Sequence, residues 1–527
     1  MTKLSKASLH DKRLWKGYLL PEFDFDAVAR KTREQPIWLH FGAGNLFRAF
    51  PAVLAQRLLN SGAMERGVIT CEGYDDEIVA GCFRRSDDLT IHITLEPDGA
   101  IEKEVIASVT ETLVLEQDRA RIEQIFAAPS LQMATFTITE KGYALYDGEQ
   151  RLLPEVALDL KAAPGNSRSF MARLTELLLH RMHSCGAPIA LVSMDNCSQN
   201  GDRLRQSVLY IADSWYKSGR LSERERIYLL QMVSFPWTMI DKITPRPERT
   251  VAERLAADGL QDITPFITKK GTYIAPFVNA ERPQYLVIED DFPNGRPPLD
   301  QAGAIFTDRE TVHKAERMKV SACLNPLQTA LAVYGCLLGY TSIAAEMQDP
   351  ELAALVGRLG REEGMPVVSD PVVLDPNNFL QEVLQLRLPN PYVPDTPQRI
   401  ATDTSQKIAA RFGYTIQSHG ENACGLTCVP LVLAGWIRYL MAVDDTGKPF
   451  SCSADPLLCW LQEKMSGISL GSVGEQSVAA VRSVLSNRNL FGADLQACGL
   501  MDKTIGYWEE MTVAPGAVRA VLKKYMA

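Results

Sequence analysis

The chain has 527 residues, of which 46% are hydrophobic and 23% are charged, as in an ordinary soluble globular protein. This length exceeds what one hydrophobic core holds, so two or three domains are expected. A formal net charge of −9 argues against nucleic acid or an anionic membrane surface as the main partner.

Cysteine and histidine usage predicts neither disulfides nor a metal site. The eleven cysteines and seven histidines form no CxxC pair and no cluster at zinc spacing. We expect free, mostly buried thiols in a reducing cytosol. The polar residues 1–6 lead into no apolar signal region, and no uninterrupted apolar stretch reaches about 18 residues. The sequence therefore predicts a cytoplasmic protein without a membrane span.

The first distinctive pattern is a strand, a glycine turn and a helix in succession. Residues 36–41 predict a buried strand, Gly42-Ala43-Gly44 follows, and residues 49–59 have helical periodicity. In a dinucleotide-binding fold, the first glycine permits the tight turn and the second lets the backbone approach a pyrophosphate. Phe47 replaces the third glycine of GxGxxG, so a purely structural turn explains the two glycines about as well.

A second predicted strand, residues 67–72, ends in Glu72. An acid at that place would accept hydrogen bonds from the adenosine ribose and repel a 2′-phosphate, which favours NAD over NADP. A solvated acid at a strand end is the alternative interpretation.

Further strands lead to Asn196. Residues 89–96 and 100–106 predict a hairpin, and residues 135–141 predict another strand. A helix over 167–182 precedes the buried strand 188–194, which ends in Asp195-Asn196. Because open α/β sheets bind ligands past the carboxyl ends of strands, Asn196 could donate to an oxygen that becomes negative during hydride transfer. Turn formation is the alternative for Asp-Asn.

Residues 234–247 contain three prolines and predict an ordered loop around the Asp241–Lys242 pair. A Pro/Gly-rich turn at 293–298 marks a change in composition. Helical patterns dominate beyond it, at residues 311–319, 327–340, 351–363, 378–385, 404–411, 428–441 and 473–485. We therefore expect an α/β protein with a Rossmann-type NAD-binding domain over 1–308 and a mainly α-helical substrate-binding and catalytic domain over 309–527.

The stretch 318–328 places Lys319, Asn325 and Gln328 ahead of the apolar run 329–340. A lysine buried at the edge of a core has its pKa lowered and can act as a base, although most lysines are solvated and amides often cap helices. Arg399 and Lys407 lie eight residues apart, about two turns if that segment is helical throughout. Such cations can grip an anionic or polyhydroxyl substrate, while exposed ion pairs are their commoner role.

These segments resemble the polyol-specific long-chain dehydrogenases, the family of mannitol 2-dehydrogenases and mannonate (fructuronate) oxidoreductases. The matching segments are residues 42–48, 193–196, 235–245, 288–292, 295–297 and 399–407, of which 235–245 is the most specific. The resemblance implies a Rossmann-type N-terminal domain, NAD as cofactor, a helical C-terminal domain and metal-independent catalysis by a lysine.

The resemblance also implies roles for single residues. Lys319 would be the general base, and Asn196 and Asn325 would hold the developing alkoxide oxygen. The predicted substrate-binding residues are Gln328, Arg399, Lys407 and Asp241. The predicted cofactor-binding residues are Gly42, Gly44, Asn45, Phe47, Arg48 and Glu72.

Two features depart from the family pattern Lys-x4-Asn-Gly-x-His. The gap from Lys319 to Asn325 is one residue longer and closes at Pro326, which predicts that a helix starts or kinks there. Gln328 stands where histidine is common, and it can orient a hydroxyl but cannot titrate near neutral pH.

The resemblance implies interconversion of a sugar alcohol or aldonate with its keto form. The first candidate substrate pair is mannonate/fructuronate, and the second candidate substrate is mannitol (or arabinitol). A non-catalytic NAD-binding sensor is the alternative of another class. A uronate carboxylate requires a cation, and the sequence does not rank Arg399, Lys407, Lys269 and Lys270 for that role. We expect a monomer or small homo-oligomer.

Overall fold

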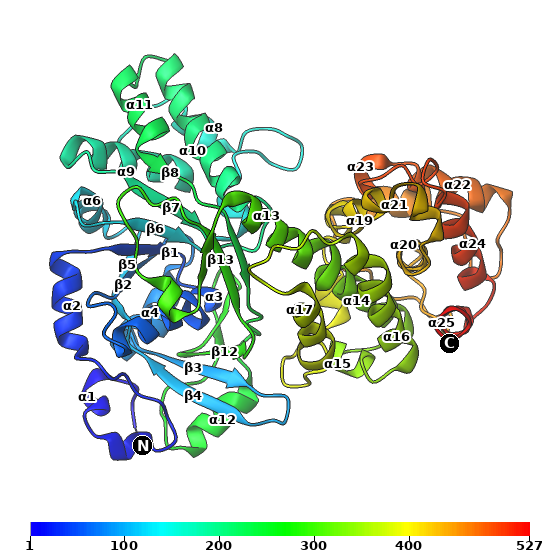
Figure 1. Ribbon diagram of the computed structural model, residues 1–527, viewed down its shortest axis with the longest axis horizontal. Coiled ribbons are helices and arrows are strands. Elements are labelled where there is room, and N and C mark those ends of the chain that lie inside the picture. Colours follow the sequence, from blue (N-terminus) through cyan, green and yellow to red (C-terminus); the bar gives the residue numbers. More distant parts are fainter. Residues whose placement is uncertain (1) are drawn as a thin grey trace. The chain divides into compact units, whose positions relative to one another are not determined.

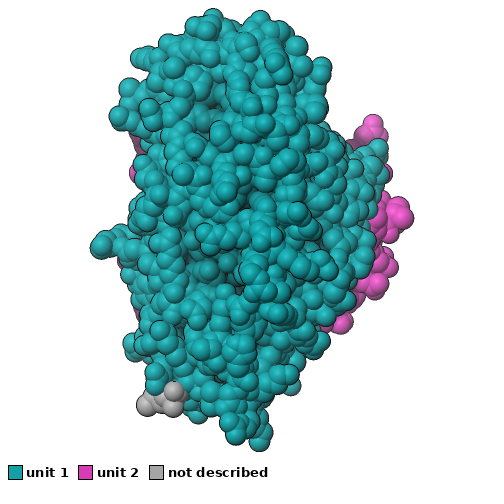
Figure 2. Space-filling view, turned by 90° about the vertical axis from the view of Figure 1, so that its left-hand side faces the viewer, with its two compact units in different colours: residues 1–313 teal, residues 314–527 magenta. Residues whose placement is uncertain are grey.

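The computed structural model describes residues 2–527 and divides the chain into two compact units, Met1–His313 and Lys314–Ala527, which are coloured separately in Figure 2. Helix α13 (Arg309–Met318) carries the chain from the first unit into the second. The division therefore falls inside the helix whose first residue is the predicted start of the second domain.

The first unit is built on a six-stranded parallel sheet with the order β5-β2-β1-β6-β7-β8. The chain moves from β1 toward one edge and then returns to build the other, so a topological switch point lies at the carboxyl ends of β1 and β6. This is the predicted Rossmann-type arrangement. The strands are β1 (Trp38–Phe41), β2 (Val68–Glu72), β5 (Val109–Val114), β6 (Met133–Phe136), β7 (Ile189–Ser193) and β8 (Val233–Ser234).

Helices cover both faces of this sheet, so most residues of its strands are buried (Figure 1). Successive side chains of a strand point to opposite faces. Trp38 accordingly joins one buried cluster, which includes α3 (Asn45–Ala49) and α4 (Pro51–Asn60). Leu39 and Phe41 join another, which includes α6 (Arg119–Ala127), α9 (Phe170–Ser184), α10 (Asn200–Lys217) and α11 (Glu223–Gln231).

Smaller sheets complete the first unit. The predicted hairpin is confirmed as antiparallel β3 (Thr90–Leu95) and β4 (Ile101–Ile106), with β12 (Phe277–Glu281) parallel to β3. A second sheet contains β9 (Thr238–Asp241), β13 (Tyr285–Glu289) and β14 (Ile305–Thr307), and β10 (Phe266–Ile267) pairs with β11 (Tyr273–Ile274). The remaining helices are α1 (Lys6–Leu9), α2 (Phe25–Glu34), α5 (Asp76–Ile78), α7 (Thr139–Gly142), α8 (Pro154–Asp159) and α12 (Arg249–Ala257).

Two local predictions for the first unit are wrong, and a third is confirmed with a later start. The strand expected over 135–141 ends at Phe136, because Thr139 adopts a φ of 62° and begins α7. The segment 234–247 is not a loop throughout, because its proline-free residues form β9 and pair with β13. The helix expected over 49–59 is confirmed as α4, which begins at Pro51 because the chain turns at Phe50 (φ −134°) after α3 ends at Ala49.

The second unit is mainly helical, as predicted, and the helices expected over 327–340, 351–363, 428–441 and 473–485 are present. Its helices are α14 (Asn325–Leu338), α15 (Ile343–Glu346), α16 (Pro350–Arg358), α17 (Pro376–Glu382), α18 (Pro397–Ile400), α19 (Tyr414–His419), α20 (Cys428–Leu440), α21 (Leu458–Lys464), α22 (Glu475–Leu485), α23 (Arg488–Phe491), α24 (Met501–Thr512) and α25 (Ala517–Met526).

Several helices of this unit adjoin π-helical turns, in which each N–H bonds five residues back. These turns are η5 (Lys319–Cys323), η6 (Leu359–Gly364), η8 (Val383–Arg387) and η10 (Ala409–Gly413). The helix predicted over 404–411 is wrong, because a 3₁₀ turn η9 (Thr404–Gln406) precedes η10 and Asp403 adopts a φ of 55°. Arg399 and Lys407 therefore do not lie on one continuous helix.

Two general expectations concern the thiols and the absence of a membrane span. All eleven cysteines are free, but only five are buried, so the expectation of mostly buried thiols is wrong.

The helical path over residues 309–338 has the length and hydropathy of a membrane span. Because 83% of its most apolar window is buried inside the structure, it has the character of a core helix.

Candidate active site

The glycine turn follows β1 at the topological switch point. Gly42 has a φ of 102°, and a Cβ there would overlap the carbonyl oxygen of Thr137, so both conformation and space require glycine. A Cβ on Gly44 would meet nothing within 4 Å. Gly44 is the N-cap residue of α3 and makes no side-chain hydrogen bond to the first N–H groups of the helix. The space next to these N–H groups is open. These features fit the backbone approach of a dinucleotide pyrophosphate.

Glu72 holds this turn in place. Its Oε2 accepts the N–H of Ala43 at 2.8 Å, and its Oε1 accepts those of Tyr74 at 2.8 Å and Asp75 at 3.1 Å. The side chain is buried, with 6% of the residue exposed. The carboxylate therefore joins the end of β2 to the turn after β1, in place of the solvated acid that was the alternative interpretation.

The side chains of Phe47 and Arg48 lie in the core beneath the turn. Phe47 stacks on His40 with ring centroids 4.0 Å apart. Arg48 Nη2 donates to the Ala275 carbonyl at 2.7 Å, and 1% of the residue is exposed. Asn45 Oδ1 and Arg48 Nη1 are buried without a hydrogen-bond partner among residues 2–527. Phe47 and Arg48 thus support the turn from below, while Asn45 carries an unused acceptor.

Asn196 is exposed on the loop that leaves β7, and its flanks are firmly held. Before it, the Asp195 carboxylate accepts the N–H groups of Ile138 and Thr139, each at 2.9 Å. These contacts tie the carboxyl ends of β6 and β7 together.

After it, buried Asn200 fixes the loop to β9. Its Nδ2 donates to the Asp195 carbonyl at 3.0 Å and to Thr238 Oγ1 at 2.8 Å, and its Oδ1 accepts the Thr238 N–H at 3.0 Å. The sequence interpretation missed Asn200. Its position at the start of a long helix, seven residues past the end of β7, was the available signal.

Asp241 is buried at the end of β9. The neighbouring Lys242 amine donates to the Glu281 carbonyl at 2.8 Å and to Gln284 Oε1 at 3.0 Å. Lys269 and Lys270 lie on the β10–β11 connection, where Lys269 pairs with Glu77 and the Lys270 amine lies 4.4 Å from the Tyr74 ring centroid. These two lysines therefore border the end of β2.

In the second unit, Lys319 is the first residue of η5 and is 1% exposed. The π turn closes with a hydrogen bond from the Leu324 N–H to the Lys319 carbonyl at 3.2 Å. Leu324 then adopts a φ of −133°, and α14 begins at Asn325 with Pro326 in its first turn. The predicted helix start is confirmed, because Pro326 has no N–H to donate and cannot continue the preceding helix.

The π turn also explains how the longer lysine–asparagine gap is accommodated. A π turn contains one residue more than the corresponding α-helical hydrogen-bonded turn. The additional residue between Lys319 and Asn325 is therefore absorbed within η5. Asn325 and Gln328 follow on one face of α14, one turn apart, and both are partly exposed.

Three cations of the second unit lie on or next to segments that pack on α14. Arg399 is on α18, which packs on α14. It forms a bidentate ion pair with Asp395, in which Nε donates to Oδ1 at 2.6 Å and Nη2 donates to Oδ2 at 2.5 Å. The Lys407 amine donates to the Thr402 carbonyl at 2.5 Å. Burial lowers the pKa of Lys407, and the nearby positive charge of Arg411 lowers this pKa further.

Arg411 is the third cation and was missed by the sequence interpretation. Its Nη1 donates to Thr329 Oγ1 at 2.5 Å, on the first turns of α14. Its place four residues after Lys407, one helical turn later, was the available signal.

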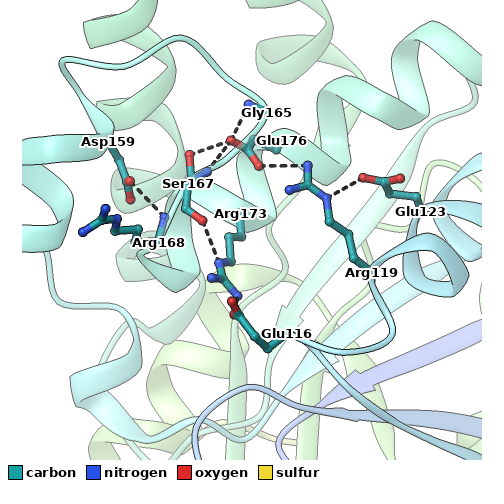
Figure 3. Close-up of polar contacts among 9 residues, drawn as sticks. All are labelled: Glu116, Arg119, Glu123, Asp159, Gly165, Ser167, Arg168, Arg173 and Glu176. Atoms are coloured by element: carbon teal, nitrogen blue, oxygen red, sulfur yellow. Dashed lines mark hydrogen bonds and ion pairs between the residues drawn. The ribbon is translucent and has the colours of Figure 1, made fainter.

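A pocket of about 480 Å³ in the first unit lies between α6 and α9 (Figure 3). Most of its charged side chains are matched with one another. Arg119 pairs with Glu123 and Glu176, and Arg173 pairs with Glu116. Glu176 also accepts the Ser167 hydroxyl at 2.6 Å. We interpret these contacts as structural. Among residues 2–527, no three His, Cys, Asp or Glu side chains are grouped as metal ligands.

Comparison with known proteins covers nearly the whole chain. Residues 36–301 match the mannitol dehydrogenase Rossmann domain, and residues 311–511 match the mannitol dehydrogenase C-terminal domain. D-mannonate oxidoreductase of Thermotoga maritima is 46% identical over 99% of this chain and 98% of its own length. D-arabinitol 4-dehydrogenase of Ralstonia nicotianae is 31% identical over 76% of this chain and 84% of its own. Mannitol 2-dehydrogenase of Pseudomonas fluorescens, solved with NAD and D-mannitol, shares the fold with a TM-score of 0.78, at 24% identity over 99% of both chains.

Proposed function

Because this chain belongs to the mannitol dehydrogenase family of oxidoreductases, we propose that it interconverts D-mannonate and D-fructuronate with NAD as cofactor. The observation that carries the proposal is the 46% identity to a D-mannonate oxidoreductase over almost the full length of both chains. Interconversion of D-arabinitol or D-mannitol with its ketose is the second candidate, favoured by the D-arabinitol 4-dehydrogenase relative.

The glycine turn of the first unit would hold the cofactor. Gly42 and Gly44 provide the open backbone surface, Asn45 provides an unused acceptor, and Glu72 keeps the turn rigid. Phe47 and Arg48 contribute by packing beneath it. Bound NAD would accept a hydride from the carbon that bears the reacting hydroxyl.

Lys319 would take the proton from that hydroxyl without help from a metal. Its burial at the start of η5 supports this role, because desolvation favours the neutral amine that a base requires. Asn196 and Asn325 would donate amide hydrogens to the oxygen as negative charge develops there. Gln328, Arg399, Lys407 and Asp241 would bind and orient the remaining substrate oxygens.

The division of labour is part of the proposal. Residues 1–308 would bind NAD, and residues 309–527 would supply the base and most substrate contacts. A cytoplasmic location and a monomer or small homo-oligomer remain predictions.

Steady-state assays of NADH formation from D-mannonate, D-mannitol and D-arabinitol test this function. We expect kcat/KM for D-mannonate to exceed that for either polyol by about 100-fold or more, because a site built for a carboxylate leaves its polar groups unpaired with a neutral substrate. A preference for a polyol would favour the second candidate. Binding of NADH without turnover of any substrate would favour the non-catalytic sensor.

A further inference from the structure

We propose that Arg411 is the residue that recognises the carboxylate of the sugar-acid substrate. This inference rests on the proposed D-mannonate activity and adds the group that distinguishes an acid from a neutral polyol.

Arg411 lies beside the segment that carries the proposed base. Its π turn η10 packs directly on η5, which begins at Lys319. The Thr415 hydroxyl, which follows η10, donates to the Ser321 carbonyl within η5 at 2.8 Å. Arg411 itself bonds to Thr329, whose hydroxyl donates to the Asn325 carbonyl at 2.9 Å. The guanidinium is thus held against the start of α14, which bears Asn325 and Gln328.

The charge environment separates Arg411 from the two cations predicted earlier. Arg399 is neutralised by its bidentate pair with Asp395. The negative charges of Asp403 and Asp455 act on Lys407. Burial lowers the pKa of Arg411 to about 10, and no acid among the described residues offsets this effect. Arg411 therefore remains protonated at neutral pH while lacking a carboxylate partner.

The free geometry of the guanidinium suits a carboxylate. An arginine offers five N–H donors in a planar fork, and Thr329 accepts from one nitrogen. The rest can form the bidentate contact that arginine prefers with carboxylates. Lys407, one helical turn earlier, is close enough for the two positive charges to repel. An anion bound beside them would relieve that repulsion, whereas a neutral polyol would not.

A structural role is the competing explanation, since Arg411 could simply fasten η10 to α14. The two roles differ in how they depend on substrate charge. Loss of a fastener would impair acid and neutral substrates alike. Loss of a carboxylate partner would raise KM for the acid and leave neutral substrates nearly unaffected.

The test compares Arg411→Gln and Arg411→Lys with Arg361→Gln in the full-length protein. Arg361 is an exposed arginine of η6, a π turn that also packs on η5, so its replacement removes the same charge from a similar element. Kinetic constants are measured for D-mannonate and D-fructuronate, and for D-mannitol and D-fructose as neutral counterparts. Circular dichroism and thermal melts check folding.

For Arg411→Gln we expect kcat/KM for the acids to fall by about 30-fold or more, mainly through KM. Added guanidinium ions should restore part of this loss. Arg411→Lys should retain intermediate activity, and Arg361→Gln should match the parent. If Arg411→Gln does not fold, the folded Arg411→Lys variant decides, because a point charge without the planar fork should still raise KM for the acids alone.

Equal losses for acidic and neutral substrates, or unchanged KM for the acids, would overturn the assignment of Arg411 while leaving the D-mannonate activity standing. Absence of D-mannonate turnover in the parent protein would instead overturn the proposed function, and the inference with it.

Discussion

The glycine turn of the first unit and the Lys319–Gln328 segment of the second satisfy their polar groups differently. At the turn, the Glu72 carboxylate accepts three backbone N–H groups, and these hydrogen bonds stabilise its negative charge within the chain. Around the second segment, Arg411 is a cation without an acidic partner among the described residues. The difference lies in the charged groups: the Glu72 carboxylate is satisfied by the chain's own N–H groups, whereas the Arg411 guanidinium has donors left for a ligand.

Replacing Lys319 should have the largest effect on activity. We expect Lys319→Ala to lower kcat by about 10²–10⁴-fold, the usual contribution of a general base, while NADH affinity measured by fluorescence stays within twofold. Lys523→Ala, which removes an exposed lysine of the same unit, is the control. Turnover that survives Lys319→Ala would remove Lys319 from its proposed role.

Replacing Gly42 should break the first region. Alanine at a φ of 102° would be strained and would overlap Thr137, so Gly42→Ala should destabilise the protein by about 2–4 kcal/mol and weaken NADH binding. Gly62→Ala isolates the strain, because Gly62 has a φ of 74° with no atom near its missing Cβ, and it should cost about 1–2 kcal/mol. The free energy of unfolding of both variants is measured by thermal or denaturant unfolding. An equal decrease in Gly42→Ala and Gly62→Ala would mean that the contact with Thr137 is unimportant.

A change at Glu72 sharpens the comparison. In the parent protein, two carboxylate oxygens of Glu72 accept three backbone N–H groups, whereas the amide of Glu72→Gln has only one oxygen to accept them. We therefore expect the free energy of unfolding to fall by about 1–3 kcal/mol. NADH affinity should fall with it, because the turn is looser. If unfolding is unchanged and activity with NADP rises instead, Glu72 acts as the ribose partner and not as a clamp.

The smallest effect on activity concerns Glu346, a buried acid beside α14. Neither of its carboxyl oxygens has a hydrogen-bond partner among the described residues, and burial, with Asp349 and Asp395 nearby, raises its pKa to about 9. The folded protein then retains a proton that the unfolded chain loses above its ordinary pKa of 4.5. Stability due to this group is complete below that value and declines as pH rises toward 9, by at most about 1.4 kcal/mol per pH unit.

Glu346→Gln should remove this dependence. We expect its melting temperature to equal the parent's near pH 5 and to exceed it increasingly toward pH 9. A constant difference across that range would show that Glu346 does not carry the proton.

Sequence reasoning identified features that depend on neighbours in the chain. Gly42 and Gly44 were found because strand, turn and helix follow one another, and the start of α14 because Pro326 restricts only adjacent backbone. It could not find the contact between Glu72 and Ala43, because that contact joins strands 29 residues apart. It also gave Arg399 and Lys407 equal standing, although the partner of Arg399, Asp395, lies only four residues earlier in the chain.

Asn200 and Arg411 show the same limit. Each is polar and lies within a helical segment, where most such residues face solvent. What singles them out is the partner, Thr238 for Asn200 and Thr329 for Arg411, and both partners belong to distant elements.

The π turn at Lys319 has a consequence for how this segment tolerates change in length. A residue inserted into an α-helix rotates everything before it by about 100° unless the backbone widens locally. Here the widening confines the extra residue to η5 and leaves α14 regular. Deleting one residue between Val320 and Cys323 would restore ordinary helical bonding without moving the first turn of α14. Such a deletion would shorten the spacing of Lys319 and Asn325 by one residue and leave α14 regular.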